Sequence, residues 1–440
     1  MNIISFFSGC GGLDLGFECA GFNIIWANEF DKTVCPTYTY NHPNVLLNTK
    51  DIREINSSDL PDCDGFIGGP PCQAWSEGGL GLGLADDRGK VFLDYIRLIK
   101  EKKPKFFLIE NVPGILSEKH NQVFSEFINQ LSVAGYNVSY QLLNAKFFNV
   151  PQDRERVFIV GIRSDFSEKY KFPQPKLTTH LSLKSAIGDI YSSPFSYNNE
   201  LVVQNEGVLF NHDVYTGAYD RKYMARNRVR TWSEVSFTIQ AQAKNIPIHP
   251  QAPKMQYVSS EKRVFVKGSE HLYRRLSVRE CARIQTFPDS FRFLYSDVKV
   301  GYKMVGNAVP PKLAYALAVS IKKTFRKNIL IGYYKGNRHL NAIQKNSLYY
   351  FPMSHDLSLD EEISYVVLHH GSIIHVFVAS SFLTQKSKEE LICKGFSPRG
   401  DVYYTVSLGN ELVNKEKDNI LKYCVQSMNS FKPILLSIDM

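Results

Sequence analysis

The stretch Ile3-Ile4-Ser5-Phe6-Phe7-Ser8-Gly9-Cys10-Gly11-Gly12 opens the chain with a short apolar run that ends in a glycine-rich turn. The apolar run predicts a buried strand, and the glycines predict a tight turn that lets the backbone approach a ligand closely. The turn does not fit the G-x-G-x-x-G spacing of dinucleotide-binding loops. Taken alone, the stretch leaves a bare tight turn open as the alternative to a site for a nucleotide-like ligand.

Further short apolar runs, each followed by polar or Gly/Pro-rich residues, occur at Asn23–Ala27, Gly65–Gly68, Phe106–Ile109 and Val157–Val160. Between them, Lys90–Lys103 and Asn121–Ala134 carry apolar residues at helical spacing. Strands that alternate with helices predict an α/β domain with a mostly parallel sheet. Ligands of such sheets bind at the carboxyl ends of the strands.

Beyond this first piece, residues 166–275 are rich in Pro, Ser, Asn and Tyr and show no long amphipathic helix. Helical pattern returns at Ser277–Thr286 and at Pro310–Lys327, where Pro310-Pro311 suits a helix start. We therefore predict an α/β piece over 1–190, an irregular insertion over 191–275 and a return to the first domain over 276–330. Residues 331–440 are expected to form a separate α/β or β-rich domain whose role the sequence does not indicate.

The composition describes an ordinary globular protein rather than a membrane or secreted one. The chain has 440 residues, 44% of them hydrophobic and 22% charged, so we expect two or three domains. No apolar run approaches the roughly 18 residues of a membrane helix, and the N-terminus does not resemble a secretory signal. A cytoplasmic protein without membrane contact is the expectation.

The distributions of cysteines and charges indicate which metals and macromolecules the protein could bind. The eight cysteines are scattered without C-x-x-C pairs, which argues against a disulfide framework and a structural zinc, so no metal is expected. The formal net charge of +9 lies entirely in the first 330 residues, because 331–440 holds 11 Lys/Arg and 11 Asp/Glu. Residues 190–275 hold 12 Lys/Arg against 7 Asp/Glu, which predicts a phosphate-binding face in the insertion.

Gly68-Gly69-Pro70-Pro71-Cys72-Gln73 places one cysteine on a loop constrained by two glycines and two prolines. A rigidly presented thiol suits a nucleophile, which needs thiolate character and a fixed direction of attack. A buried structural cysteine is the alternative, because free cysteine is among the most buried residue types. The following Ser76–Gly83 contains four glycines and predicts a mobile lid over a substrate.

Polar side chains follow two of the predicted strands and precede a third. Glu29 ends the second strand, where an acid can bind both hydroxyls of a ribose, although a solvated strand-end acid is equally open. Glu110 follows Phe106–Ile109 at the sheet edge of Cys72, where a shielded carboxyl can act as an acid; a surface residue is the alternative. Gln152-Asp153-Arg154-Glu155-Arg156 supplies guanidinium groups there, or forms an ordinary surface ion-pair cluster.

Six motifs together resemble the cytosine-C5 DNA methyltransferase family in order and spacing over residues 1–325. They are Phe7-Ser8-Gly9, Pro71-Cys72-Gln73, Glu110-Asn111-Val112, Gln152-Asp153-Arg154-Glu155-Arg156, Arg275-Leu276-Ser277-Val278-Arg279-Glu280 and Gly306-Asn307-Ala308-Val309-Pro310. Arg226-Asn227-Arg228-Val229-Arg230 and His249–Pro253 are similar to the bacterial branch that methylates GGCC, typified by the HaeIII methyltransferase. Ala241–Asn245 departs from the stretch associated with GGCC recognition, which puts that target in doubt.

The resemblance implies a Rossmann-like S-adenosylmethionine-dependent methyltransferase sheet with an inserted target-recognition domain and an extra C-terminal domain. Its catalytic residues would be Cys72, Glu110, Arg154 and Arg156. The Cys72 thiolate would add to C6 of cytosine while Glu110 holds N3 protonated and Arg156 binds O2. The methyl group would then go to C5, and loss of the C5 proton and of Cys72 would restore aromaticity. The base must swing out of the duplex, because neither the thiol nor the methyl donor can reach a stacked base.

The implied cofactor is S-adenosyl-L-methionine. Similarity places Phe7 against the adenine, Glu29 on the ribose, Asp51 near the adenine amino group and Asn307 near the methionine end. The implied cofactor residues are Phe7, Ser8, Gly9, Gly11, Gly12, Leu13, Glu29, Phe30, Asp51, Ile52, Pro71, Asn307 and Ala308. Ser5 departs from the family, since many members have Asp there, and we interpret the change as tolerated.

The implied partner is double-stranded DNA, with a restriction endonuclease as a functional counterpart, and we expect a monomer. Arg226, Arg228 and Arg230 are spaced by two, so in an extended segment all three could face one groove. Arginine is the usual reader of guanine, although contact with phosphate alone is the alternative. The predicted recognition residues are Arg226, Arg228, Arg230, Gln240 and Lys244. We predict a short G·C-rich target, GGCC or a relative.

Three other functions compete with this prediction. A transfer-RNA cytosine methyltransferase on the same fold is the nearest, and the basic insertion of more than 80 residues between Arg156 and Arg275 favours DNA instead. A DNA-binding module without catalysis conflicts with the intact Cys72, Glu110 and Arg156. A nucleotide-dependent oxidoreductase would explain the first loop but leaves Cys72 and Glu110 without a purpose.

Overall fold

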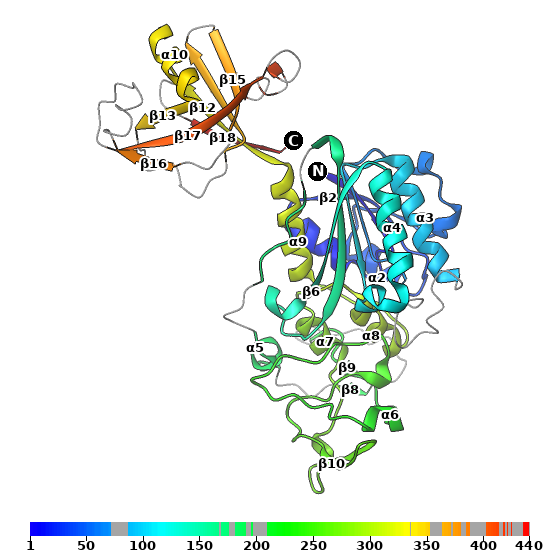
Figure 1. Ribbon diagram of the computed structural model, residues 1–440. Helices are drawn as coiled ribbons and strands as arrows, with labels where there is room; N and C mark the ends of the chain where they lie inside the picture. Colours follow the sequence, from blue (N-terminus) through cyan, green and yellow to red (C-terminus); the bar gives the residue numbers. More distant parts are fainter. Residues whose placement is uncertain are drawn as a thin grey trace. The chain divides into compact units, whose positions relative to one another are not determined.

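The computed structural model contains two compact units, unit 1 over Met1–Ile321 and unit 2 over Lys322–Met440 (Figure 1). The structure describes residues 1–71, 87–166, 169–175, 181–190, 195–196, 209–334, 336–352, 363–370, 373–379, 384–387, 402–412, 417–418, 420, 424 and 434–439. Cys72 and the predicted lid Ser76–Gly83 lie outside these residues, as does most of 191–208.

The core of unit 1 is a seven-stranded sheet in the order β3-β2-β1-β4-β5-β7-β6. Its strands are β1 (Asn2–Phe6), β2 (Asn23–Asn28), β3 (Leu46–Asn48), β4 (Gly65–Gly68), β5 (Phe106–Asn111), β6 (Tyr136–Asn144) and β7 (Glu155–Arg163). The pairs from β3 to β5 are parallel, whereas β7 runs antiparallel between β5 and β6. The predicted α/β class with a mostly parallel sheet is therefore confirmed, and β3 and β6 are added to the five predicted strands.

Helices cover this sheet and bury its apolar side chains. The longer helices up to residue 325 are α1 (Gly12–Cys19), α2 (Cys35–Asn41), α3 (Asp87–Lys102), α4 (Asn121–Val133), α7 (Val278–Ile284), α8 (Val298–Asn307) and α9 (Pro311–Phe325). Of these, α7 packs against α5 and α8 rather than on the sheet. One core cluster joins α3 and α4 to the strands through Phe92, Tyr95 and Phe127, all buried against Phe66 and Phe107. Helices α3, α4, α7 and α9 correspond to the four predicted helices.

Helices α1 and α9 meet at Gly16. A Cβ at this position would lie 2.3 Å from the Cβ of Ala314, so only glycine permits the observed approach. Short 3-10 turns complete the connections: η1 (Ile52–Glu54), η2 (Ser57–Asp59), η4 (Pro113–Leu116), η5 (Glu118–His120), η6 (Ala145–Phe148), η7 (Ser164–Phe166), η8 (Ala243–Asn245) and η9 (Glu270–Leu272).

Apart from α7, the 209–297 region has little regular structure. The short elements of this region and of the segment leading to it are α5 (Leu183–Ile187), β8 (Phe195–Ser196), β9 (Asp213–Val214), α6 (Arg221–Met224), β10 (Gln256–Ser259) and β11 (Lys262–Val264). In this region, buried arginine side chains donate the hydrogen bonds that neighbouring strands would donate in a sheet. The Arg275 guanidinium donates to the carbonyls of Tyr215 (3.2 Å), Gly217 (2.7 Å) and Ala218 (3.1 Å) and lies 4.0 Å from the Tyr219 ring centroid.

A second buried arginine acts in the same way. Arg279 donates to the carbonyls of Phe210 (2.8 Å), Pro288 (3.2 Å) and Phe291 (2.7 Å), and both Arg275 and Arg279 are almost fully buried. Each guanidinium therefore satisfies several loop carbonyls that have no strand neighbour to donate to them.

Unit 2 is a second sheet in the order β13-β17-β15-β14-β12-β18, with β16 paired to β17. Its elements are β12 (Arg326–Tyr333), α10 (Gly336–Asn346), β13 (Leu348–Pro352), β14 (Tyr365–His370), β15 (Ile373–Ala379), β16 (Thr384–Ser387), β17 (Val402–Glu411) and β18 (Ile434–Asp439). Strand β12 pairs with β14 and β18. Because these strand pairs place 326–330 in unit 2, the boundary between the two units lies at Ile321/Lys322, not at the expected 330/331.

Candidate active site

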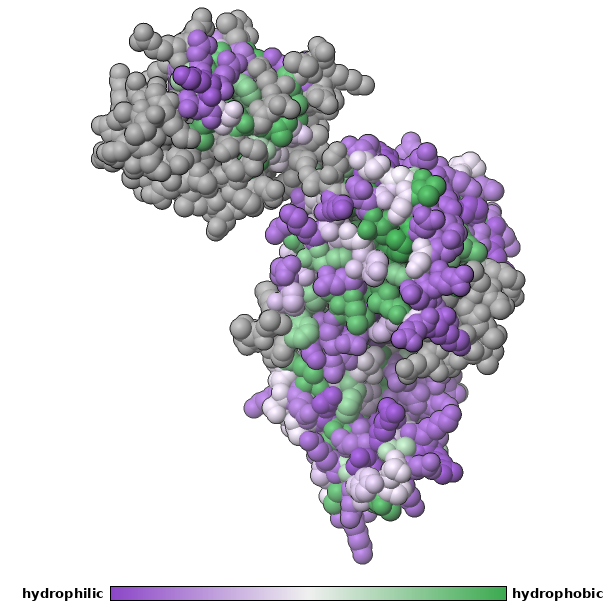
Figure 2. Space-filling model, in the orientation of Figure 1, coloured by the Kyte–Doolittle hydropathy of each residue, from purple (hydrophilic) through white to green (hydrophobic). Residues whose placement is uncertain are grey.

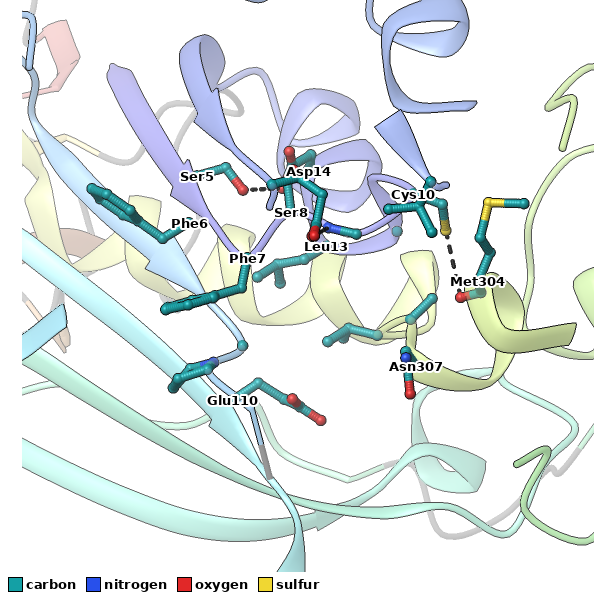
Figure 3. Close-up of a pocket in the computed structure, with 18 of the residues that line it drawn as sticks. Ser5, Phe6, Phe7, Ser8, Cys10, Leu13, Asp14, Glu110, Met304 and Asn307 are labelled. Atoms are coloured by element: carbon teal, nitrogen blue, oxygen red, sulfur yellow. Dashed lines mark hydrogen bonds between the residues drawn. The ribbon is translucent and has the colours of Figure 1, made fainter. Parts of the chain in front are cut away.

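An open cavity of about 310 Å³ lies where β1, β2, β4 and β5 end (Figure 3). Each of these strands contributes lining residues at or just beyond its last residue, and α8 contributes Lys303, Met304 and Asn307. The lining residues are Ser5, Phe6, Phe7, Ser8, Gly9, Cys10, Gly12, Leu13, Asp14, Glu29, Asp31, Val34, Gly69, Pro70, Pro71, Glu110, Val112, Arg156, Lys303, Met304, Asn307, Ala308 and Val309. The cavity therefore lies at the edge of the sheet where the sequence predicts ligand binding.

The glycine-rich turn after β1 forms one wall through an unusual backbone. Phe7, Gly9 and Gly11 all have positive φ angles, of 52°, 56° and 92°. A Cβ at Gly11 would lie 2.1 Å from His42 Nε2, so this position requires glycine for both its conformation and its neighbour. The Ser8 hydroxyl is buried and has no hydrogen-bond partner among the described residues. A buried orphan hydroxyl on a cavity wall is a group that a ligand can satisfy.

Glu29 stands at the end of β2 and is oriented by two backbone groups. Its Oε2 accepts a hydrogen bond from the Gly9 N–H (2.8 Å) and its Oε1 accepts one from the Asp31 N–H (2.7 Å). Burial raises the pKa of Glu29. Each carboxylate oxygen still has a lone pair for a further donor, as binding of ribose hydroxyls requires.

Asp31 and Lys303 line the cavity beside Glu29, and the sequence did not single out either. Lys303 Nζ donates to Asp31 Oδ2 (2.5 Å) and to Thr33 Oγ1 (3.0 Å). Burial opposes ionisation of Asp31, but its hydrogen bonds with Lys303 and Thr33 outweigh burial and lower its pKa. The only sequence signal for this pair is that Asp31 follows Glu29 and Lys303 precedes Asn307 by one helical turn.

The departure at Ser5 has a structural explanation. The Ser5 hydroxyl donates to Asp14 Oδ1 (2.6 Å), and the Tyr38 hydroxyl donates to Asp14 Oδ2 (2.6 Å). Asp14 is fully buried, and burial raises its pKa. An Asp at position 5 would place a second carboxyl against Asp14, whereas serine supplies a donor.

Glu110 and Arg156 form an ion pair across neighbouring strands. Glu110 on β5 lies opposite Phe158 on β7, and Arg156 lies two residues before Phe158, so the two side chains point to one face of the sheet. Arg156 Nε is 2.9 Å from Glu110 Oε1, and both side chains are largely buried. A carboxylate and a guanidinium therefore stand side by side in the cavity, as predicted from the motifs.

Arg154 does not reach the cavity, although we expected it among the catalytic residues. It is fully buried, and its guanidinium donates to the carbonyls of Ile239 (3.1 Å), Gly306 (2.9 Å) and Ala308 (3.0 Å). Its cation is used to satisfy backbone carbonyls at the end of α8. Arg154 thus supports the residues around Asn307 rather than touching a substrate.

The expected cofactor residues divide into two groups. Phe7, Ser8, Gly9, Gly12, Leu13, Glu29, Pro71, Asn307 and Ala308 line the cavity. The others do not: Phe30 is 63% exposed, Ile52 is buried, Gly11 immediately precedes α1, and Asp51 holds Arg53 through both carboxylate oxygens. Asp51 and Ile52 start η1, beyond the strand ends that form the cavity.

The predicted recognition residues are not equivalent in the structure. Arg226 is exposed, but Arg228 donates to the Tyr223 carbonyl (2.9 Å) and lies over the Tyr223 ring. Arg230 pairs with Glu234 (3.0 Å), and Lys244 is 3.6 Å from Asp220. The buried Val229 separates Arg228 from Arg230.

Near these arginines, one hollow of about 190 Å³ lies in the 209–297 region. Its lining residues are Arg228, Phe237, Thr238, Gln240, Asn245 and Pro247. Arg228 and Gln240, predicted as separate recognition residues, therefore share one small concavity.

Among the described residues, no helix is long and apolar enough to span a membrane. In the same described part of the chain, no group of three or more His, Cys, Asp or Glu residues is placed to hold a metal ion.

Known proteins similar to this chain match it mainly along unit 1. Residues 1–323 match a family model described as C-5 cytosine-specific DNA methylase. The type II methyltransferase M.MthTI of Methanothermobacter thermautotrophicus is 53% identical over 324 residues, which cover 73% of this chain and 97% of that protein. M.FnuDI of Fusobacterium nucleatum, also a type II methyltransferase, is 50% identical over 327 residues, 74% of this chain and 95% of that protein.

Solved structures share the fold at much lower identity. The Entamoeba histolytica methyltransferase EhMeth aligns with a TM-score of 0.55 at 20% identity, over 74% of this chain and 98% of its own. Spodoptera frugiperda DNMT2 aligns with a TM-score of 0.54 at 17% identity, over 73% of this chain and 99% of its own. The predicted Rossmann-like methyltransferase fold is confirmed. With the family model matching most of the chain, the protein belongs to the C-5 cytosine-specific DNA methylase family.

Proposed function

We propose that the protein transfers a methyl group from S-adenosyl-L-methionine to C5 of a cytosine in double-stranded DNA, as the modification enzyme of a type II restriction–modification pair. The Glu110–Arg156 pair supports this most directly, because it lies in one cavity with Glu29 and Pro71. In cytosine, O2 is bonded to the ring carbon next to N3, and a carboxylate beside a guanidinium matches these two atoms. The two type II methyltransferases at 53% and 50% identity support the restriction–modification role.

The cavity residues fit the proposed cofactor. Phe7 and Leu13 offer apolar surface to an adenine, Glu29 has acceptor capacity for ribose hydroxyls, and the buried Ser8 hydroxyl needs a partner. When bound, S-adenosyl-L-methionine supplies a methyl group on a sulfonium sulfur, which leaves as a neutral thioether. The polar end of the cavity, at Asn307, is the place for the methionine moiety.

The protein's own residues would act on the cytosine as follows. Cys72, which lies outside the described residues, adds as a thiolate to C6, and the ring electrons move to C5. Glu110 gives its proton to N3 as the thiolate adds, its carboxylate then accepts a hydrogen bond from N3–H, and Arg156 donates to O2. Once C5 carries the methyl group, the C5 proton passes to water, the C6–S bond breaks and N3 returns its proton to Glu110, which restores the thiolate and the aromatic ring. The base is extruded from the duplex at a cost of a few kcal/mol.

Target selection is assigned to the 209–297 region, whose face in Figure 2 is mainly hydrophilic with small hydrophobic patches. The hydrogen bonds of Arg228 use Nε and Nη2, so the remaining N–H groups of its fork can donate to guanine O6 and N7. Its position against Tyr223 fixes the direction of this fork in advance. We propose GGCC or a related G·C-rich site as the target, with Gln240 reading from the same hollow.

Bisulfite sequencing of DNA from cells that express the protein tests this function. We expect cytosine methylation confined to one short sequence in cells with wild-type protein, and none with Cys72→Ser, because a hydroxyl of much higher pKa cannot replace the thiolate. The exposed Cys19→Ser is the matched control and should methylate like wild type. Methylation found in transfer RNA but not in DNA would contradict the proposal.

The covalent step has an independent test. Duplex DNA with 5-fluorocytosine at the target lacks the proton that elimination requires, so a denaturant-resistant protein–DNA adduct should accumulate. The adduct should require the cofactor and Cys72. Adduct formation by Cys72→Ser would show that another residue is the nucleophile.

A further inference from the structure

Helix α8 is tied to both loops that hold Glu29. The Cys10 thiol of the glycine-rich turn donates to the Met304 carbonyl (3.6 Å), and Lys303 Nζ holds Asp31 and Thr33 of the loop after β2. Lys303 and Asn307 are one helical turn apart, and both line the cavity. The face of α8 that would meet the methionine end of the cofactor is therefore the same face that fastens the loop beside the ribose site.

Lys303 acts on Glu29 through Asp31, which contacts both residues. The Asp31 N–H donates to Glu29 Oε1, so movement of Asp31 moves the donor that orients this carboxylate. The Asp31 carboxylate also repels that of Glu29, whereas the Lys303 ammonium attracts it. Without Lys303, two neighbouring carboxylates would face each other across a partly buried loop, and Glu29 would lose its fixed direction.

We propose that Lys303 and Asp31 are positioning residues for the cofactor, which hold Glu29 in the orientation that binds the ribose hydroxyls. The inference rests on the proposed cofactor site and adds two residues outside the expected set. Neither residue needs to touch the cofactor. The effect should therefore fall on cofactor affinity and not on the methyl-transfer step.

The loop that Asp31 begins is also fastened at its far end, so loss of Lys303 should not unfold it. On α2, the Thr37 hydroxyl accepts from the Leu294 N–H (2.8 Å), and the Asn41 amide both donates to and accepts from the Arg292 backbone (2.8 and 3.0 Å). These contacts do not involve Lys303. Variants at Lys303 can therefore be examined as folded proteins.

Calorimetric titration of the full-length protein with S-adenosylhomocysteine and with adenosine tests the proposal. Lys303→Met should weaken both ligands about tenfold, the size expected when a hydrogen bond to a charged group is weakened. Adenosine is decisive because it retains the ribose but lacks the methionine carboxylate. Asp31→Asn should give a similar loss, and the double variant should lose little more, since the two residues act through one path. Lys303→Arg, which keeps the cation, should recover most of the affinity.

Kinetics and a control variant complete the test. In Lys303→Met, KM for S-adenosyl-L-methionine should rise with kcat nearly unchanged at saturation.

Lys299→Met, on the same helix but with an exposed side chain paired to Asp297, should bind both ligands like wild type. Loss of S-adenosylhomocysteine binding with unchanged adenosine binding would overturn the proposal, because it would show direct contact of Lys303 with the carboxylate. Unchanged binding of both ligands would also overturn it. Failure of wild type to bind either ligand would instead contradict the cofactor site itself.

Discussion

The sheet domain and the 209–297 region of the same unit are stabilised in different ways. In the sheet, β1, β4 and β5 are almost entirely buried and carry Ile, Phe and Leu, so apolar burial and the strand ladder act together. In the 209–297 region, strands are two to four residues long, and the guanidinium groups of Arg275 and Arg279 satisfy loop carbonyls instead. The first region is built on side-chain apolarity and the second on buried cations.

This difference changes the meaning of positive charge in the sequence. We predicted a phosphate-binding face from the surplus of Lys and Arg over 190–275, but several of these side chains are used inside the protein. Arg275 is buried, Arg274 pairs with the buried Glu280 (2.7 Å), and Arg230 pairs with Glu234. Exposed cations such as Arg226, and the unused N–H groups of the half-buried Arg228, are the proposed contacts with DNA. Net charge alone does not separate the two uses.

If the sheet edge carries the chemistry, the largest effect should come from Glu110. Glu110→Gln keeps the size of the side chain but removes the negative charge that holds N3 protonated. Turnover should fall by something like ~10²–10⁴-fold, typical of lost general acid–base catalysis, with much smaller change in DNA affinity. Single-turnover methylation and gel-shift titration measure the two quantities. A parallel loss of binding and turnover would assign Glu110 to structure.

If buried arginines maintain the 209–297 region, Arg275→Met should destabilise unit 1 strongly. The substitution leaves the Tyr215, Gly217 and Ala218 carbonyls without their donor, and we expect the free energy of unfolding to fall by about 3 kcal/mol. The exposed Arg226→Ala is the matched control and should change it by less than about 0.5 kcal/mol. Urea unfolding followed by tryptophan fluorescence makes the comparison. Equal stabilities would show that Arg275 is not structural.

The same contrast explains which elements the sequence could predict. The buried strands at Ile3–Phe7 and Phe106–Ile109 show continuous apolar runs, and α3 and α4 show helical spacing, so all four were predictable. Helix α8 was missed because Gly301 and Gly306 weaken its helical pattern. The edge strand β6 was missed because its residues Ser139–Leu142 are partly or fully exposed and mostly polar.

Site residues follow a similar rule. Glu29 and Glu110 were predictable because each directly follows an apolar strand, which fixes its place at the sheet edge. Lys303 and Asp31 meet across 272 residues of sequence, and no local pattern indicates that contact. Arg154 and Arg156 are two residues apart in one motif, yet only Arg156 lines the cavity. The local sequence predicts where a residue lies along a strand, but it does not predict which group a long side chain contacts.

A smaller effect should separate the arginines of the 209–297 region from one another. Arg228→Ala should reduce methylation of the cognate site and relax preference at one base pair, by roughly 1–3 kcal/mol of discrimination. Arg226→Ala should weaken binding to all sequences alike and reduce its salt dependence, as expected for a phosphate contact. Methylation rates on a panel of sites at fixed salt compare the two variants. Uniform loss in both would leave Arg228 as a phosphate contact and contradict its proposed role as a reader.

Acid should act on the 209–297 region through His249, and the effect should be confined to pH values below 6.5. Burial lowers the pKa of His249 from 6.5 to about 4, an effect that the nearby Glu280 only partly opposes. Between these two values the unfolded chain binds a proton that the folded protein excludes. Stability is therefore complete above pH 6.5 and is lost as the pH falls towards 4, with a slope of at most ~1.4 kcal/mol per pH unit.

His249→Asn isolates this contribution, because the amide oxygen can accept the Gln251 N–H as His249 Nδ1 does, yet it does not titrate. Between pH 6.5 and 4 the variant should lose less stability than wild type. Glu280 also has a lowered pKa and destabilises the protein in acid, but the larger cause of that lowering, its hydrogen bond with Arg274, is present in both proteins. The exposed His271→Asn should keep the wild-type pH dependence. Identical curves for wild type and His249→Asn would show that His249 does not couple protons to folding, and acid sensitivity would then belong to carboxylates such as Glu280.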